Sequence, residues 1–162
     1  MDSDCLIKIT KAEMKEALTG AVDALITPTV VAETVDAAPP EDSVTAERIR
    51  RNVDCGRLRL NKTAARDRHP LAGLASALGD GERSVLDLLQ AVGADAVATD
   101  DGRFSKLLRR NGIRVMGSAE LLAFLLELKV VSKAEALEIV SRLTGLIPQD
   151  QYMEVRRAID DA

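Results

Sequence analysis

Three short apolar segments alternate with longer amphipathic segments, and this alternation constrains the fold more than any other feature of the sequence. The short segments are Ala24 to Thr27, Ala96 to Thr99 and Arg114 to Met116. The segment Arg57 to Leu60 alternates with a period of two, so we expect a strand whose leucines face a core and whose arginines face outward. Short strands separated by helices are typical of a parallel sheet. We therefore predict an α/β fold with a mainly parallel central sheet flanked by helices.

Apolar residues at helical spacing, together with residues that begin or end helices, predict the helical segments. The expected helices of the first part of the chain are Ala12 to Gly20, Pro28 to about Val35, one capped by Asp42 or Ser43 that ends at about Asn52, Gly81 to Val92 and Gly102 to Asn111. A helical C-terminal extension is expected to contain helices from Ala119 to Leu128, from a capping box at Ser132 to about Leu143, and from Pro148 to about Asp160. We expect one domain over residues 1–162, with a core of about residues 1–117, an extension of about residues 118–162, and a long loop from Thr63 to Asp80.

The scarcity of certain residue types limits the possible chemistry. The chain has one histidine, His69, next to Pro70 in a loop-like stretch, and two isolated cysteines, Cys5 and Cys55. A zinc site, a serine–histidine–aspartate arrangement and a disulfide framework are therefore not expected, and the cysteines are expected to fill the core as reduced thiols. Any metal site would consist of carboxylates, and oxygen ligands select hard cations such as Mg²⁺ or Mn²⁺.

Basic residues are concentrated in two runs, although the formal net charge is −4. The first run includes Arg48, Arg51, Arg57 and Arg59, and the second, from Arg103 to Arg114, contains no acidic residue. Because Lys and Arg neutralise phosphates, both runs are candidates for contact with a nucleic-acid backbone. The alternative is that they form solvated helix faces and a protected sheet edge. With two phenylalanines, one tyrosine and no tryptophan, platforms that stack on bases are not expected.

No segment is expected to enter a membrane. The longest apolar stretch, Leu121 to Val131, is interrupted by Glu127 and Lys129 and is far shorter than the roughly 20 apolar residues that a spanning helix needs. The beginning of the sequence is rich in charged residues and lacks the apolar stretch of a secretory signal. We therefore expect a cytoplasmic protein.

Acidic residues occur at four points where the predicted pattern passes from strand to helix. They are Asp2 with Asp4, Glu33, Glu82, and Asp100 with Asp101. Ligands of parallel sheets bind beyond the carboxyl ends of the strands, so these acids are candidates for one shared site. Each also has a structural interpretation, namely helix capping, a helix-dipole interaction, a solvated helix face or a frayed terminus. Their joint placement favours a bound cation, because clustered carboxylates repel one another.

Several short motifs, taken in order, resemble the PIN (PilT N-terminal) domain nuclease family. The opening Asp2-Ser3-Asp4-Cys5-Leu6-Ile7 is similar to the family signature D-[ST]-x-x-L-I, and Pro28 to Glu33 is similar to a family segment in which a glutamate follows a proline and a valine. Gly81-Glu82 resembles the G-E that opens an acidic helix in one prokaryotic branch, and Thr99-Asp100-Asp101 resembles the T-x-D after the next strand. Gly117 to Val131 is similar to the C-terminal helix of that branch.

The resemblance implies a nuclease that hydrolyses RNA phosphodiester bonds with a water activated by Mg²⁺ or Mn²⁺. The catalytic acids on this matching are Asp2, Glu33, Glu82 and Asp101, and the metal ligands are Asp2, Glu82, Asp101 and its near alternate Asp100. Secondary roles fall to Ser3, Asp4 and Thr99, and the expected contacts with RNA phosphates come from Arg48, Arg51, Arg57 and Arg59. The family places several apolar residues before its first aspartate as a central strand, whereas only Met1 precedes Asp2 here. We expect that this strand is either truncated or begins upstream of Met1.

Other functions stay open at this point. A haloacid-dehalogenase-type phosphatase would use Asp2 as the nucleophile and Asp4 as the general acid, but its scheme gives Glu33 and Glu82 no role. A PIN-like module could instead bind RNA or a protein partner without cutting. The resemblance is also compatible with the toxin of a toxin–antitoxin pair, held by an antitoxin protein, and with a homodimer.

Overall fold

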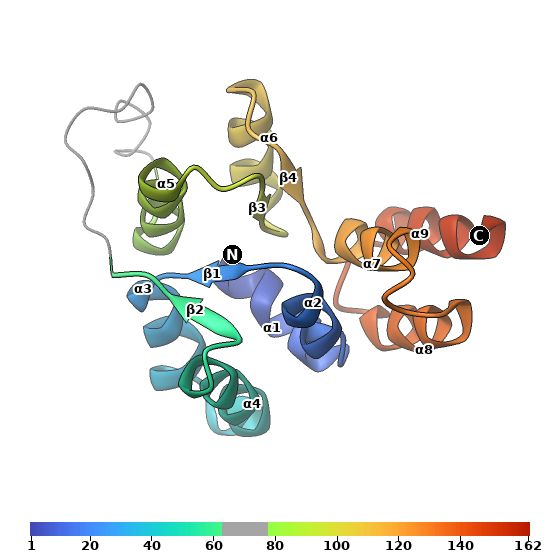
Figure 1. The fold of residues 1–162 in the computed structure, drawn as a ribbon, viewed down its shortest axis with the longest axis horizontal. Coiled ribbons are helices and arrows are strands. Elements are labelled where there is room, and N and C mark those ends of the chain that lie inside the picture. Colours follow the sequence, from blue (N-terminus) through green and yellow to red (C-terminus); the bar gives the residue numbers. More distant parts are fainter. Residues whose placement is uncertain (63–77) are drawn as a thin grey trace.

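The computed structural model describes residues 1–62 and 78–162, and helices predominate in it (Figure 1). In chain order the elements are α1 (Ser3–Lys11), α2 (Lys15–Ala21), β1 (Ala24–Ile26), α3 (Pro28–Val31), a π-helical turn (Ala32–Asp36), a 3₁₀ turn (Pro40–Asp42), α4 (Ser43–Asp54), β2 (Leu58–Leu60), α5 (Asp80–Val92), β3 (Val97–Ala98), α6 (Gly102–Arg110), β4 (Val115–Met116), α7 (Ser118–Glu127), α8 (Lys133–Leu143) and α9 (Gln149–Asp161).

The strands of the described residues form two separate parallel pairs. β1 pairs with β2, with Leu25 opposite Arg59, and β3 pairs with β4, with Val97 opposite Val115. Each pair is joined through at least one helix, as parallel strands require. The predicted α/β class with short parallel strands is therefore confirmed.

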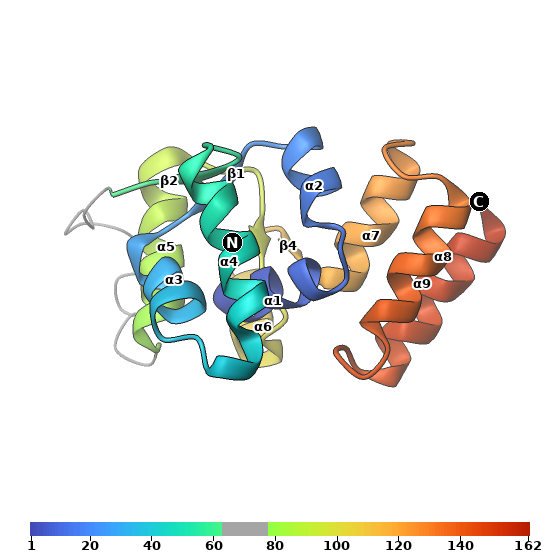
Figure 2. The same cartoon turned by 90° about the horizontal axis from the view of Figure 1, so that it is seen from below.

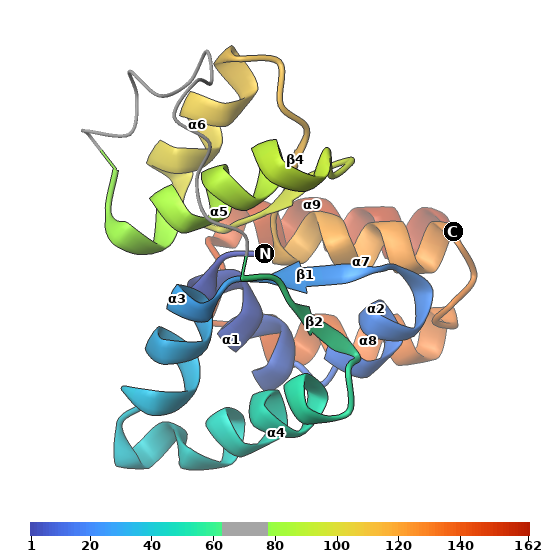
Figure 3. The ribbon, with the colours of Figure 1, turned by 60° about the vertical axis from the view of Figure 1, so that its left-hand side comes forward.

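Residues 1 and 2 lie between the two strand pairs and connect them. The amino group of Met1 donates to the backbone carbonyl of Leu25 at 2.9 Å, and the backbone N–H of Asp2 donates to the carbonyl of Ala98 at 2.9 Å. The backbone order across the molecule is thus β2, β1, residues 1–2, β3 and β4. Figure 3 shows the N-terminus in this position, close to β1.

Helices cover both sides of the strands and extend past one end of them. Figure 3 shows α5 and α6 on one side of the strands and α1 to α4 on the other. Helices α7, α8 and α9 lie side by side at the opposite end of the molecule from α5 (Figure 2). The core between these layers is apolar, and Leu6, Ile26, Phe104 and Leu122 are each 0% exposed.

The structure bears out most of the predicted segments with small changes of bounds. The brief strand after Val22, the helix that ends at Gly93 and the capping box of α8 are all present. The predicted helix from Pro28 is divided into α3 and a π-helical turn, so its last part winds more loosely than expected. Of the predicted loop Thr63 to Asp80, residues 63–77 lie outside the described residues, and Asp80 already belongs to α5.

Three predictions about the first part of the chain were wrong. Helix α1 covers Ser3–Lys11, and Glu13 has a left-handed φ of 63°, so the next helix begins at Lys15 and not at Ala12. Cys55 is exposed because it lies in the turn between α4 and β2, whereas Cys5 is buried as expected. Leu60 at the end of β2 is 37% exposed, so only Leu58 of that strand faces the core.

None of the helices in residues 1–62 and 78–162 combines the length and the apolar character that a bilayer-crossing segment needs.

Candidate active site at the strand ends

The acidic residues named above lie where strands end and helices begin. Asp2 is the second of the two residues that link the strand pairs, and Asp101 follows β3. Glu33 is the second residue of the π-helical turn that follows β1 and α3, and Glu82 lies in the first turn of α5. This edge of a parallel arrangement is where ligands of α/β proteins bind.

Asp2 is the most buried of these acids. Its residue is 7% exposed, and the hydroxyl of Thr99 donates to its Oδ2 at 2.8 Å. Burial raises the pKa of the Asp2 carboxyl, and the charge of Asp4 adds to this effect. The hydrogen bond from Thr99, the backbone N–H of Ser3 and the terminal amine offset the rise only in part. Asp2 is therefore not a frayed terminus but an ordered carboxylate whose ionised form is disfavoured.

Thr99 connects Asp2 to Asp101. Besides donating to Asp2, its hydroxyl oxygen accepts the backbone N–H of Asp101 at 3.1 Å. Asp101 Oδ1 accepts the backbone N–H of Phe104 at 2.6 Å, so this carboxylate also caps α6. The Asp101 side chain therefore caps a helix and is at the same time a candidate residue of the site. Asp101 is exposed to solvent.

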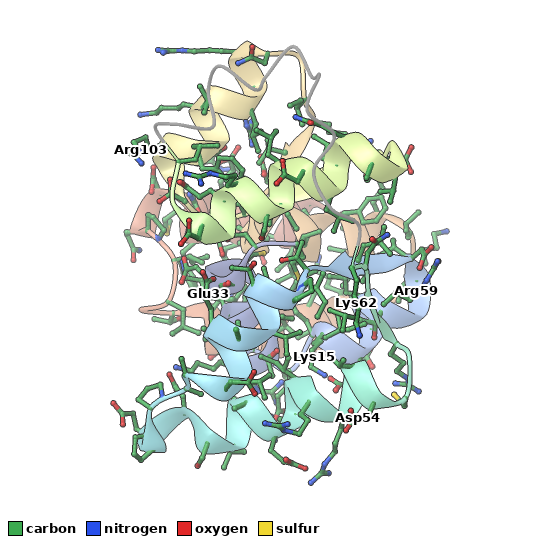
Figure 4. All side chains as sticks on the ribbon, turned by 90° about the vertical axis from the view of Figure 1, so that its left-hand side faces the viewer. Lys15, Glu33, Asp54, Arg59, Lys62 and Arg103 are labelled. Atoms are coloured by element: carbon green, nitrogen blue, oxygen red, sulfur yellow. The ribbon has the colours of Figure 1, made fainter. Side chains whose placement is uncertain are left out.

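Glu33 reaches back to the start of the chain. The hydroxyl of Ser3 donates to Glu33 Oε2 in a short hydrogen bond. On its other side the Glu33 carboxylate touches Gly81, where a Cβ atom would lie 2.7 Å from Glu33 Oε1. Glycine at position 81 thus leaves the space that the carboxylate fills. In Figure 4, Glu33 lies between α5, drawn in yellow-green, and the blue helices of the first part of the chain.

Glu82 follows Gly81 and so lies next to the position of Glu33. Its carboxylate accepts the backbone N–H of Gly79 at 2.8 Å and caps α5, which agrees with the helix-dipole interpretation. Oε2 also lies 3.9 Å from a guanidinium nitrogen of Arg103 on α6. The Glu82 side chain is 16% exposed, so it keeps contact with solvent at the site.

Asp4 and Asp100 form a separate cluster with Lys8. The Lys8 ammonium lies 2.6 Å from Asp4 and 3.7 Å from Asp100. Burial alone lowers the pKa of Lys8, but the hydrogen bond to Asp4 and the charge of Asp100 outweigh it and raise that pKa. The two Asp100 oxygens accept from the backbone N–H, at 2.8 Å, and from the hydroxyl of Ser118. Asp100 thereby caps α7.

Two series of contacts between neighbouring residues therefore link the four predicted catalytic acids. One runs from Asp2 through Thr99 to Asp101, and the other from Ser3, next to Asp2, through Glu33 to Gly81 and Glu82. Of the predicted ligands, Asp100 is the one that faces Ser118 and Lys8 instead.

The donor set of the site fits a hard cation in its chemistry. Carboxylate and hydroxyl oxygens are the ligands that Mg²⁺ and Mn²⁺ prefer. Across the described ranges, 1–62 and 78–162, no three Asp, Glu, His or Cys side chains stand close enough together to hold a metal ion. The carboxylates are bound to Thr99, Ser3 and backbone N–H groups, so a cation would have to replace some of these donors. The metal ligands stay a prediction.

The four arginines predicted to bind RNA lie away from these acids. Arg48 pairs with Glu13 at 3.2 Å, beyond the C-terminal end of α1, whereas Asp2 precedes the N-terminal end. Helix α1, of nine residues, places Glu13 and Asp2 at opposite ends of a length of about 13 Å at 1.5 Å per residue. Arg59 pairs with Asp23, on the side of β1 where that strand begins. Arg51 pairs with Glu47 on α4, and Arg57 is exposed.

Arg103 of the second basic run lies nearer to the acids. It contacts Glu82, and in Figure 4 it lies on the same side of the view as Glu33, whereas Arg59 lies on the opposite side. Lys106 and Arg110 follow at helical spacing on α6 and are exposed. Sequence reasoning identified this run but assigned the phosphate contacts to the first one. The absence of acids between positions 103 and 114 was the signal that could have favoured it.

Sequence reasoning also missed the part played by two glycines. Gly81 directly precedes Glu82, which caps α5, and Gly117 directly precedes Ser118, the first residue of α7. A Cβ at Gly117 would lie 2.9 Å from Asp100 Oδ1. Both positions therefore accommodate a carboxylate that arrives from another element. Their place directly before Glu82 and Ser118 was the available signal.

Comparison with known families gave one match. A family model described as a PIN domain matches residues 1–159, which is nearly the whole chain. Searches of curated proteins and of solved structures gave no match.

Proposed function

The chain belongs to the PIN domain family, and on this premise we propose that it is a divalent-metal-dependent endoribonuclease. PIN domains have a nuclease-type fold, so activity on nucleic acids is the general expectation. The observation that carries the narrower proposal is the linkage of Asp2, Asp101, Glu33 and Glu82 through Thr99 and Ser3 at one edge of the strands.

The residues that would hold a divalent cation are Asp2, Glu82 and Asp101, with Glu33 beside them. When bound, such a cation supplies an activated water and stabilises the charge that develops on the phosphate. Asp2 favours this use because its buried carboxylate is costly to ionise without a positive partner. Those of the present hydrogen bonds to the carboxylates that a cation does not replace would keep the carboxylates oriented toward it.

Substrate contact is proposed for α6. Arg103 stands beside Glu82, and Lys106 and Arg110 continue the same helix, so a polyanion that reaches the acids would meet these cations. The scarcity of aromatic residues supports recognition through the phosphate backbone and not through base stacking. Arg48, Arg51, Arg57 and Arg59 would then act as a more distant electrostatic surface.

The phosphatase alternative receives less support from the same contacts. It needs Asp4 to act together with Asp2, but the Asp4 carboxylate is bound to Lys8 and its side chain is 55% exposed. It also leaves Glu33 and Glu82 without a role. A toxin of a toxin–antitoxin pair is a biological setting in which such a ribonuclease occurs, and co-purification with a small inhibitory protein would identify it.

The decisive experiment compares Glu82→Gln with Glu120→Gln on labelled RNA in Mg²⁺, Mn²⁺ and EDTA. Both glutamates cap a helix through the N–H of a glycine three residues earlier, at 2.8 and 2.7 Å, and both lie near an arginine. We expect that cleavage needs the divalent ion and that only Glu82→Gln loses it by orders of magnitude. Equal activity of the two variants, or full activity in EDTA, would overturn the proposal. An aryl phosphate in parallel tests the phosphatase reaction.

A further inference from the structure

Two hydroxyl groups join the part of the chain that carries Glu33 to the helix that carries Glu82. Thr27 follows β1 and caps α3, and Ser84 lies in α5, three residues after Gly81. The two hydroxyl oxygens lie 2.8 Å apart, although the residues are 57 positions apart in the chain. Helices α3 and α5 pack against each other here, and Figure 3 shows them close together.

The hydroxyl proton of Thr27 needs an acceptor outside its own helix. The Thr27 oxygen accepts the backbone N–H of Val30 at 3.2 Å, which is the usual N-cap interaction. Because Thr27 is 4% exposed, water is a poor acceptor for its proton. The oxygen of Ser84 takes this place.

The proton of Ser84 points away from Thr27. The Ser84 hydroxyl lies 2.7 Å from the carbonyl oxygen of Gly81, and a carbonyl oxygen can only accept. Ser84 has one hydroxyl proton and gives it to Gly81, so Thr27 is the donor in the contact between the two hydroxyls. The hydrogen bonds therefore run in one direction, from the N–H of Val30 through both hydroxyls to the carbonyl of Gly81.

The last acceptor of this series belongs to the residue that the Glu33 carboxylate touches. A Cβ atom on Gly81 would lie 2.7 Å from Glu33 Oε1, so the carboxylate occupies the space beside this glycine. Glu33 reaches it from the π-helical turn that continues α3. The series thus connects the first turn of α3 to the glycine that receives Glu33, and Glu82 follows that glycine directly.

Each half of the series has a local explanation, but the contact between the halves does not. Threonine is a common N-cap, and serine hydroxyls in helices often bind a carbonyl of the preceding turn. Neither interaction requires a partner from the other helix. Alanine at position 84 would preserve α5 but would leave the buried proton of Thr27 without its acceptor, which is costly. The contact therefore serves the relative position of the two helices.

We propose that Thr27 and Ser84 are positioning residues of the candidate site. Their hydroxyl pair fixes the first part of α5 against the end of β1, so that Glu33 lies beside Gly81 and next to Glu82. The effect expected on cleavage rests on the proposed nuclease function, whereas the coupling of the two hydroxyls does not.

The first test measures the hydroxyl pair by thermal unfolding, without any reaction. Alanine is a better helix former than serine, so Ser141→Ala, at an exposed position of α8, should leave the thermal midpoint unchanged or higher. Ser84→Ala should lower the midpoint by at least about 2 °C, because Thr27 loses its acceptor. Equal midpoints for Ser84→Ala and Ser141→Ala would overturn the proposal.

A double variant shows whether the two hydroxyls act together. Thr27→Val and Ser84→Ala each remove the same hydrogen bond between the helices. We therefore expect the midpoint of the double variant to fall by less than the sum of the two single falls. Additive falls would show that the hydroxyls are not coupled and would overturn the proposal.

The second test measures RNA cleavage in Mg²⁺. We expect Ser84→Ala to lower kcat at least about tenfold and to change KM by less than about twofold, because it displaces an acid and leaves the cations of α6 in place. Ser84→Thr keeps a hydroxyl and should retain most of kcat, and Ser141→Ala should equal the unaltered protein. Thr27→Ser and Thr27→Val repeat the comparison from the other side of the pair. Equal losses with and without the hydroxyl at both positions would overturn the proposal.

A combination with Gly81→Ala tests whether the pair acts through Glu33. Because the alanine Cβ already displaces the Glu33 carboxylate, adding Ser84→Ala to this variant should lower kcat by less than about a further twofold. A further tenfold loss would overturn the action through Glu33. If the unaltered protein does not cleave RNA, the proposed function fails, and the midpoint of the Thr27→Val and Ser84→Ala double variant still decides whether the hydroxyls are coupled.

Discussion

The hydroxyl of Thr99 joins Asp2 to Asp101: it donates to the carboxylate of Asp2 and accepts the backbone N–H of Asp101. Thr99 is 2% exposed, so both hydrogen bonds are shielded from water. A single buried hydroxyl therefore links the carboxylate of the first acid of the candidate site to the backbone of the last.

Replacing Thr99 by valine keeps the shape of the side chain but removes both hydrogen bonds. We expect the free energy of unfolding to fall by about 1–3 kcal/mol, because the buried Asp2 carboxylate loses its donor. RNA cleavage should fall by at least about tenfold. Thr99→Ser keeps the hydroxyl and should retain most of the activity, and similar losses in both variants would show that the hydroxyl is not responsible.

Asp2→Asn should stabilise the metal-free protein at neutral pH while it abolishes cleavage. The pKa of Asp2 is raised in the folded state, so the folded protein binds a proton more tightly than the unfolded chain. Its stabilising effect is present at low pH and is lost as the pH rises from about 3.8 through the raised pKa. Thermal midpoints at pH 4 and pH 8 measure this, and the gain from Asp2→Asn should be larger at pH 8. Asp150→Asn, which removes an exposed carboxylate on α9, is the control.

Gly81→Ala should impair the site without unfolding the protein. The added Cβ would lie 2.7 Å from Glu33 Oε1, so the flexible carboxylate has to leave its place beside Ser3. We expect at least a tenfold loss of cleavage with a change in the free energy of unfolding below about 1 kcal/mol. Gly102→Ala is the matched control, because a Cβ at that helix start meets nothing within 4 Å. Comparable activity of the two variants would show that the position of Glu33 is unimportant.

Asp101→Asn separates the metal role of this residue from its capping role. Asparagine caps a helix about as well as aspartate, so α6 should persist. We expect Mg²⁺ or Mn²⁺ to raise the thermal midpoint of the unaltered protein and to raise that of the variant much less. A variant that keeps the full metal-dependent rise would remove Asp101 from the proposed ligands.

Arg103→Ala should weaken RNA binding and lower the slope of log affinity against log salt by up to about one phosphate contact. Arg48→Ala, which removes a cation at the far end of α1, should change the slope less. Binding of inactive Glu82→Gln protein to a labelled RNA at several salt concentrations provides the measurement. If Arg48→Ala has the larger effect, the first basic run is the substrate surface after all.

Local signals made much of the fold predictable. The capping box at Ser132 and the left-handed Gly93 act within a few residues, so the sequence around them is sufficient. The bounds of α1 and α2 depended on Glu13, a non-glycine residue in a left-handed conformation, which no local pattern indicates. The looser turn that carries Glu33 is another departure from regular helix geometry that apolar spacing did not reveal.

The candidate site shows the same division between local and long-range information. The order of the acids along the chain indicated that they belong together, because parallel strands bring their carboxyl ends to one edge. Which aspartate is linked to Asp2 through Thr99 depended on long-range contacts: Ser118 and Lys8 bind Asp100, and Thr99 accepts the backbone N–H of Asp101. The position of Arg48 was likewise set by the packing of α4 along α1 and not by the density of arginines in the sequence.

Asp100 also has a consequence for how the chain can be divided. It attaches the first turn of α7 to the end of β3, and α7 and α8 both pack against α1, whose first residues carry the site. The buried apolar side chains of α7 to α9 belong to the same cluster as those of α1 and the strands. A chain cut before Ser118 is therefore expected to lose the candidate site, because α1 would lose the support that positions Asp2 and Ser3.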